Sequence, residues 1–253
     1  MDLEPRMFFI VCPLVFLGGL LDAIAGGGGL ISLPAYLFAG TPIHFALGTN
    51  KLSSIAGTAA ASYRYYKNRY IDMVLCAPCI AASLAGSAIG TSLTMRIDER
   101  YLQRLLLVIL PVTAFYVFKR KNFDAVPPLS RPKTIALAVG ISFIVGGYDG
   151  FFGPGAGTFL ILLYTGLAKI DGTIAAGNAK FVNLGSNLSA LVLFLLNGRV
   201  LLPLGLCAAV FGVLGAYIGS GLVIRRGVTV IRYAILTVLA LLFIKVAWDA
   251  FFS

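Results

Sequence analysis

Long apolar runs dominate this sequence and limit the folds that it can adopt. Residues 73–95, for example, form a nearly continuous apolar segment, and about 18 apolar residues already suffice to cross a membrane as a helix. Only 12% of the 253 residues are charged, against about 25% in soluble domains. The runs do not alternate as membrane-barrel strands do. The sequence therefore predicts an all-α polytopic membrane protein.

The positive net charge of +10 follows from topology rather than from nucleic-acid binding. Most basic residues lie in short connections between apolar runs, as expected for cytoplasmic loops. The clearest such loop is the proline-containing segment 119–133, which we interpret as a basic cytoplasmic linker. The first residues lack the basic region and cleavage site of a secretory signal, so we expect an uncleaved first span in the cell (inner) membrane.

Two parts of the chain repeat each other. A shift of 129 positions aligns Lys51 with Lys180, and a shift of 127 aligns Asp22 with Asp149. Breaks at matching positions in two halves are the best sequence indication of a transporter's binding site. We predict three regions: a first transmembrane repeat, the linker and a second transmembrane repeat, at residues 1–118, 119–133 and 134–253.

The relative orientation of the repeats depends on the number of membrane crossings. Five crossings in each half would make the repeats inverted, whereas four, with a re-entrant hairpin, would make them parallel. With the linker in the cytoplasm, the inverted arrangement also places Arg225, Arg226 and Arg232 there, so we favour it.

Two lysines within the apolar runs are the strongest candidates for function. A charged side chain near the bilayer centre costs at least about 2.5–3.5 kcal/mol and usually faces a cavity or a partner. Lys51 and Lys180 hold equivalent repeat positions and together would form a positive site for an anion. In an alternative interpretation they only pair with Asp149 and Asp22 and hold the bundle together. The two are compatible, because an ion pair can open when substrate arrives.

Polar and glycine residues close to these lysines complete the predicted site. Amide and hydroxyl groups can replace the water that an oxyanion loses. The clusters Gly26–Gly29 and Gly153–Gly157 would unwind a helix and expose the amide end of a half-helix starting at Leu30 or Thr158. Besides the lysines, the predicted substrate-binding residues are Thr49, Asn50, Ser53, Asn178, Asn183, Asn187, Gly27, Gly28 and Gly155. Asp22 and Asp149 are candidates for coupling through a proton or Na⁺.

Other motifs indicate packing or no chemistry. Gly86, Gly90, Gly215 and Gly219 are expected to let helices approach closely. The four adjacent glycines lack the lysine–threonine/serine ending of a phosphate-binding loop, which argues against a nucleotide cofactor. A single histidine, His44, expected at the surface, makes a metal site improbable. We expect neither an enzyme nor a cofactor.

The duplicated motifs resemble those of the TauE/SafE family of sulfite exporters and sulfonate permeases. The resemblance rests on the Gly26–Gly29 cluster followed by Leu33-Pro34, on 48–52 and on 179–183 with 186–187, and it covers essentially the whole chain. It implies secondary transport of small sulfur-containing anions, such as sulfoacetate or sulfite, through a midplane site between the repeats by alternating access. Alternatives are a passive anion channel, a transporter of a non-sulfur organic anion, or a membrane scaffold without transport. The substrate, the direction, the coupling ion and the oligomeric state are left open.

Overall fold

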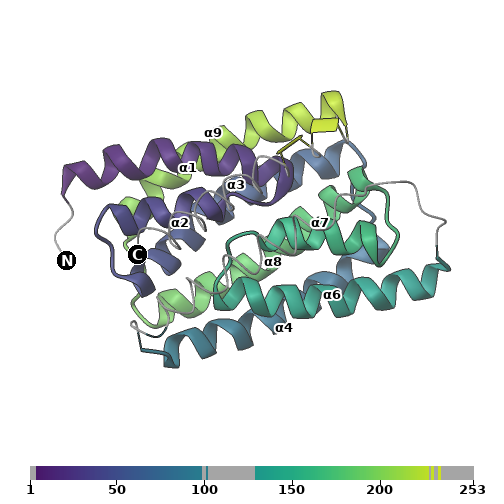
Figure 1. Ribbon diagram of the computed structural model, residues 1–253, viewed down its shortest axis with the longest axis horizontal. Coiled ribbons are helices and arrows are strands. Elements are labelled where there is room, and N and C mark those ends of the chain that lie inside the picture. The colour runs from purple at the N-terminus through teal and green to yellow at the C-terminus, as the bar shows by residue number, and fades with distance from the viewer. Residues whose placement is uncertain (1–3, 99–100, 102–128, 228, 231–232, 235–253) are drawn as a thin grey trace, which may run out of the picture.

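The computed structural model describes residues 4–98, 101, 129–227, 229–230 and 233–234, and their regular structure is helical throughout (Figure 1). Five helices are long and apolar enough to cross a membrane: α1 (Pro5–Ala25), α4 (Met73–Arg96), α6 (Arg131–Phe151), α8 (Gly172–Leu196) and α9 (Leu202–Arg226). The polytopic all-α fold is thereby confirmed. Residues 102–118 of the predicted first repeat and residues 119–128 of the linker lie outside the described residues.

Two short helices follow the glycine clusters. After α1 ends at Ala25, Gly26 adopts a φ of 75°, and the ten-residue α2 (Gly29–Phe38) begins. After α6 ends, Gly155 adopts a φ of 82° and precedes the eleven-residue α7 (Ala156–Gly166). Positive φ values are costly for residues with a side chain, which is why glycine occupies both turns. The predicted breaks are confirmed, and each short helix starts one or two residues before the expected position.

The long helices pack in pairs, and each pair combines one helix from each half of the chain. Helix α1 packs on α9 and α6 packs on α4, while α3 (Ile43–Lys67) and α8 meet at the centre (Figure 1). A Cβ at Gly215 would lie 2.0 Å from the carbonyl oxygen of Phe16, and one at Gly86 would lie 2.1 Å from that of Phe143. Gly90 and Gly219 are equally crowded. The packing role predicted for these glycines is confirmed.

The contacts between helices of opposite halves agree with the predicted duplication. Phe16 and Phe143 are separated by 127 positions, as are Asp22 and Asp149, so equivalent residues make equivalent contacts. In Figure 1, α1 begins at the left side of the bundle, whereas α6 begins at the right. Helices that start at opposite ends support the inverted arrangement. The duplication and its orientation stay predictions that these observations favour.

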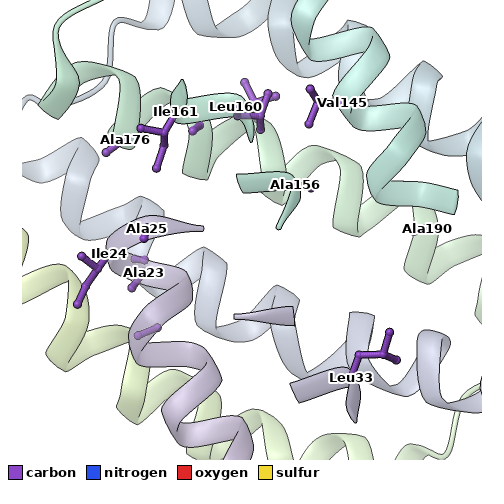
Figure 2. Packing of buried hydrophobic residues seen from close by; sticks show 14 of the residues in the cluster. Ala23, Ile24, Ala25, Leu33, Val145, Ala156, Leu160, Ile161, Ala176 and Ala190 are labelled. Carbon is purple, nitrogen blue, oxygen red and sulfur yellow. The ribbon is translucent and has the colours of Figure 1, made fainter. Parts of the chain in front are cut away.

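Small buried residues lie at the contacts between the helices. Ala23, Ala25, Ala156 and Ala176 are almost fully buried, and larger side chains such as Ile161 fill the spaces around them (Figure 2). Large apolar side chains are instead exposed on the outer face, among them Phe9, Val74, Ile144 and Leu196. This distribution suits helices that pack closely in lipid, where small residues allow close approach.

His44 lies inside the bundle, not at the surface as expected. Its side chain is 7% exposed, and its Nε2 lies 3.1 Å from the carbonyl oxygen of Thr94 in α4. The expectation rested on the adjacent turn at Pro42, but Ile43 already starts α3, which carries His44 into the bundle.

Candidate functional site

The two lysines occupy equivalent places in the central helices. Lys51 lies eight residues after the first residue of α3, and Lys180 lies eight residues after the first residue of α8. Both side chains are at most 5% exposed. An isolated buried ammonium group would be strongly destabilising, so each needs a partner of opposite charge.

Lys51 pairs with Asp149 of α6 in a dense hydrogen-bond network. Its Nζ lies 2.8 Å from Oδ1 of Asp149 and donates to Oδ1 of Asn187 at 3.0 Å. The second carboxylate oxygen of Asp149 accepts hydrogen bonds from Ser186 Oγ at 2.5 Å and Asn183 Nδ2 at 3.2 Å. Both oxygens of Asp149 are thus engaged, and the pair is held in one geometry.

Lys180 pairs with Asp22 of α1 in simpler surroundings. Its Nζ lies 2.7 Å from Oδ2 of Asp22, and the same oxygen accepts a hydrogen bond from Thr58 Oγ1 at 3.3 Å. The side chain of Asp22 is 19% exposed, against 5% for Asp149. The pairing considered as the alternative interpretation, Lys51 with Asp149 and Lys180 with Asp22, is therefore present in the structure.

Both ion pairs join one half of the chain to the other. Lys51 lies in the first half and Asp149 in the second, and the second pair reverses this arrangement. Truncating one partner of a buried pair typically costs about 3–5 kcal/mol, because it leaves an uncompensated charge. The pairs consequently contribute to the association of the two halves whether or not they also bind a ligand.

A small polar cavity, open to solvent, lies between the two pairs. Three polar side chains that the sequence singled out, Asn50, Asn183 and Asn187, line it together with Lys51 and both aspartates. The Oδ1 atom of Asn50 is buried and makes no hydrogen bond with the described residues. The remaining lining residues are Gly26, Gly29, Ser54, Gly153 and Gly157.

The charge of this region decides how an anion could bind. Two ammonium groups and two carboxylates cancel, so an anion must take the place of a carboxylate beside a lysine. Amide groups of Asn50, Asn183 and Asn187 can then complete its hydrogen bonds. The arrangement can exchange one oxyanion for another without exposing a lysine to lipid.

Thr49 and Asn178 make contacts that differ from their predicted role. Thr49 Oγ1 accepts a hydrogen bond from the backbone N–H of Leu201 at 3.0 Å, and Asn178 Oδ1 accepts one from that of Asp72 at 3.0 Å. Leu201 and Asp72 are the residues directly before α9 and α4. Neither Thr49 nor Asn178 lines the cavity, and both fix the start of a neighbouring helix.

Other predicted residues lie around the cavity rather than in its wall. Ser53 donates to the carbonyl of Asn50 and accepts from the hydroxyl of Tyr36, and Gly28 lines a smaller neighbouring cavity with it. Gly27 lies in the turn between α1 and α2, and Gly155 supplies the turn before α7. Lys180 does not line the central cavity and reaches it only through Asp22.

The glycine clusters allow two backbones to cross beside the ion pairs. A Cβ at Gly26 would lie 2.2 Å from the carbonyl carbon of Gly157. A Cβ at Gly153 would lie 3.2 Å from Nζ of Lys51 and 3.3 Å from Oδ1 of Asp149. The glycines therefore make room for the crossing of the two breaks and for the Lys51–Asp149 pair.

One contributing residue was outside the predicted site: Thr58 donates to Asp22. Ser186, which donates to Asp149, lies in the 186–187 motif but was not among the predicted substrate-binding residues. The repeat register contained the signal for Thr58, since a shift of 129 aligns it with the predicted Asn187. Among the described residues, no three His, Cys, Asp or Glu side chains gather as a metal site.

Comparison with known proteins gives consistent matches over the whole chain. The family described as "Sulfite exporter TauE/SafE" matches residues 11–246. A "Probable membrane transporter protein" of Haemophilus influenzae is 34% identical over 250 residues, covering 98% of both chains. "Probable membrane transporter protein ORF9" of a Sinorhizobium species is 33% identical, covering 98% of this chain and 95% of its own. "Probable membrane transporter protein YfcA" of Escherichia coli K12 is 31% identical, covering 98% and 92%. No solved structure matches the chain.

Proposed function

Because the chain belongs to the TauE/SafE sulfite exporter family, a family of membrane transporters and not of enzymes, we propose that it is a secondary transporter of small sulfur-containing anions. The substrates in this proposal are sulfonates such as sulfoacetate, or sulfite-type oxyanions. The protein is a multi-pass protein of the cell (inner) membrane, with the lipid bilayer and a small anion as its partners.

The observation that carries the proposal is the polar cavity between two buried lysine–aspartate pairs. Lys51 reaches this cavity, and Asn50, Asn183 and Asn187 add amide groups. A sulfonate or sulfite group offers three oxygens, which matches several converging donors better than a single one. In the proposed bound state, the anion replaces Asp149 beside Lys51, and the freed carboxylate keeps its bonds to Ser186 and Asn183.

The crossed pairs also suggest how access alternates. Each ion pair bridges the two halves of the chain. The helix breaks that precede α2 and α7 contact each other at Gly26 and Gly157. Rocking of one half against the other around a fixed midplane site is the usual route of transporters with broken helices. We propose that one ion pair loosens in each direction of this motion.

The distribution of basic residues supports one orientation in the membrane. One end of the bundle carries most of the described cations: Arg64, Lys67, Arg69, Arg131, Lys133, Lys169, Arg225 and Arg226. The opposite end carries Arg6, Arg96 and Arg199. By the positive-inside rule, the first end faces the cytoplasm, which places the start of α1 outside.

Transport by purified protein in proteoliposomes tests the proposal. We expect uptake of labelled sulfoacetate or sulfite, and we expect its loss in Lys51→Ala and in Lys180→Ala. Because a single substitution leaves a buried charge, the double variant Lys51→Met/Asp149→Leu serves as a control that removes the pair without an orphan charge.

The outcomes separate the competing interpretations. Full uptake in a folded double variant would show that this pair serves stability only. Uptake of simple carboxylates with no uptake of sulfonates or sulfite would indicate a non-sulfur organic anion instead. Flux that always follows the anion's own gradient, and responds to no proton or Na⁺ gradient, would indicate a passive channel.

A further inference from the structure

The two aspartates differ in how many of their oxygens are engaged. Asp149 uses one carboxylate oxygen for Lys51 and the other for Ser186 and Asn183. Asp22 receives both Lys180 and Thr58 on the same oxygen, Oδ2. Its Oδ1 accepts no hydrogen bond from the described part of the chain. One aspartate is therefore saturated, and the other keeps an open acceptor.

The sequence explains this difference through the repeat register. A shift of 129 aligns Asn183 with Ser54 and Ser186 with Gly57. Asp149 accepts hydrogen bonds from the amide of Asn183 and the hydroxyl of Ser186. At the equivalent positions near Asp22, Ser54 makes no hydrogen bond in the described structure, and Gly57 has no side chain. These two neighbours of Asp22 therefore donate no hydrogen bond to its second carboxylate oxygen, Oδ1.

Asp22 also lies at a boundary between two cavities. It lines the central cavity and a second small cavity, whose wall includes Gly28, Ser32 and Gly57. Ser54 lines both cavities as well. The buried Oδ1 of Asn50, which also belongs to the central cavity, accepts no hydrogen bond within the described part of the chain. The side chain of Asp22 is 19% exposed, so water in either cavity can bring a proton to this residue.

We propose that Asp22, and not Asp149, is the carboxylate that takes up and releases the coupling proton, an inference that rests on the transport function proposed above. Protonation of Asp22 removes the negative partner of Lys180, so this ammonium becomes available to balance an incoming anion. Asp149 acts as the fixed counter-charge that keeps Lys51 in place when no anion is bound.

Charge balance calls for one cation at this place, and repulsion by Lys180 favours a proton over Na⁺. The two pairs are neutral together, so a monoanion in the cavity leaves a net charge of −1, and one proton on Asp22 restores neutrality. A Na⁺ ion would have to bind next to the Lys180 ammonium, which lies 2.7 Å from the same carboxylate. Two cations on one carboxylate in a poorly solvated site repel each other strongly.

Few titratable groups of the described residues lie near Asp22. Helix α8 contributes Lys180, and the shared central cavity contributes Lys51 of α3 and Asp149 of α6. Tyr65 of α3 lies nearby and donates its hydroxyl to the carbonyl of Ala23. From α2, α7 and α9, only uncharged residues line the two cavities. Among these groups, Lys180 is the one that contacts the Asp22 carboxylate directly.

Gradient-driven transport of isethionate, a permanently ionised sulfonate, tests this assignment in proteoliposomes. An inward proton gradient should make the wild type accumulate label above the external concentration. Asp22→Asn should remove this accumulation, while exchange of labelled for unlabelled isethionate persists at a reduced rate. Asp149→Asn should lose accumulation and exchange together. The reverse pattern, or accumulation driven by Na⁺ but not by protons, would overturn the proposal.

A second measurement does not depend on the substrate. Infrared difference spectra of the full-length protein in lipid, recorded during a pH titration, report the C=O band of protonated carboxyl groups. A component of this band should be present in the wild type and in Asp149→Asn and absent in Asp22→Asn. Identical spectra for the wild type and Asp22→Asn would refute the inference. If no anion is transported but this component is found, only the proposed function fails.

Discussion

Helices α3 and α8 hold equivalent positions in the two halves, but their polar residues have diverged. Both are 25 residues long, and both carry a buried lysine at the same place. Helix α8 presents Asn183, Ser186 and Asn187 around the first ion pair, whereas α3 presents little more than Thr58 around the second. The difference indicates that charge is needed on both sides of the cavity, while hydrogen bonding decides which pair is rigid.

The two glycine breaks also differ, because Gly26 is tightly packed and Gly155 is not. Substitutions at these glycines give the largest expected effect on folding. Gly26→Ala places a Cβ 2.2 Å from the backbone of Gly157 and also forces a residue with a side chain to a φ of 75°. We expect loss of folded protein, measured by size-exclusion chromatography and thermal unfolding in detergent. Gly155→Ala is the matched control, since its φ of 82° is similar but its Cβ has open space.

Gly155→Ala should lower the unfolding free energy only by the cost of a left-handed backbone for a residue with a side chain, about 1–2 kcal/mol. Equal losses in Gly26→Ala and Gly155→Ala would show that the crossing of the two breaks is not tightly packed. The comparison therefore separates steric crowding at the crossing from the conformational cost that both positions share.

Removing the lysines one at a time compares the two ion pairs. Lys51→Ala leaves Asp149 buried and charged, so we expect a loss of about 3–5 kcal/mol in unfolding free energy. Lys180→Ala should cost less, because Asp22 is 19% exposed and can be hydrated from a cavity. Denaturant unfolding in mixed micelles measures both. A larger loss for Lys180→Ala would contradict the view that the first pair is the rigid one.

Single hydrogen-bond donors sharpen the same comparison. Ser186→Ala removes a 2.5 Å hydrogen bond to a buried carboxylate, which should cost about 1.5–3 kcal/mol. Thr58→Val removes a 3.3 Å hydrogen bond to the more exposed Asp22 and keeps the side-chain shape, so its effect should be smaller. Thermal unfolding of both variants beside the wild type measures the difference. Equal shifts would mean that the two carboxylates depend similarly on their neighbours.

Much of the architecture was predictable from sequence because its signals are strong there. Apolar runs fixed the fold class, the glycine clusters located the breaks, and the spacing of Lys51 and Lys180 indicated equivalent sites. The roles of Thr49 and Asn178 were not predictable. In α3 and α8 the polar residues are not confined to one face, so periodicity does not tell which face meets the cavity, and both side chains instead contact the residue before a neighbouring helix. The burial of His44 was missed because the turn at Pro42 suggested an exposed position, whereas α3 already begins at Ile43.

The ends of the central helices provide the smallest test of the comparison. Asp171 caps α8, where it accepts hydrogen bonds from the hydroxyl and N–H of Thr173 and the N–H of Ile174, while Pro42 at the equivalent position before α3 offers no side-chain cap. The hydrogen bond from the Thr173 hydroxyl, and then those from the backbone, lower the pKa of Asp171. Asp171→Ala should therefore cost about 0.5–2 kcal/mol at neutral pH.

The sign of the pH dependence follows from the lowered pKa. The cap stabilises the folded protein fully above the ordinary aspartate pKa of about 3.9, and its contribution is lost as the pH falls through the lower folded value. Melting temperatures of the wild type and Asp171→Ala should thus differ at neutral pH and converge in acid. Asp171→Asn, which keeps a neutral cap, should show a smaller difference with little pH dependence. A difference that grows on acidification would mean that Asp171 stabilises α8 through something other than its charged cap.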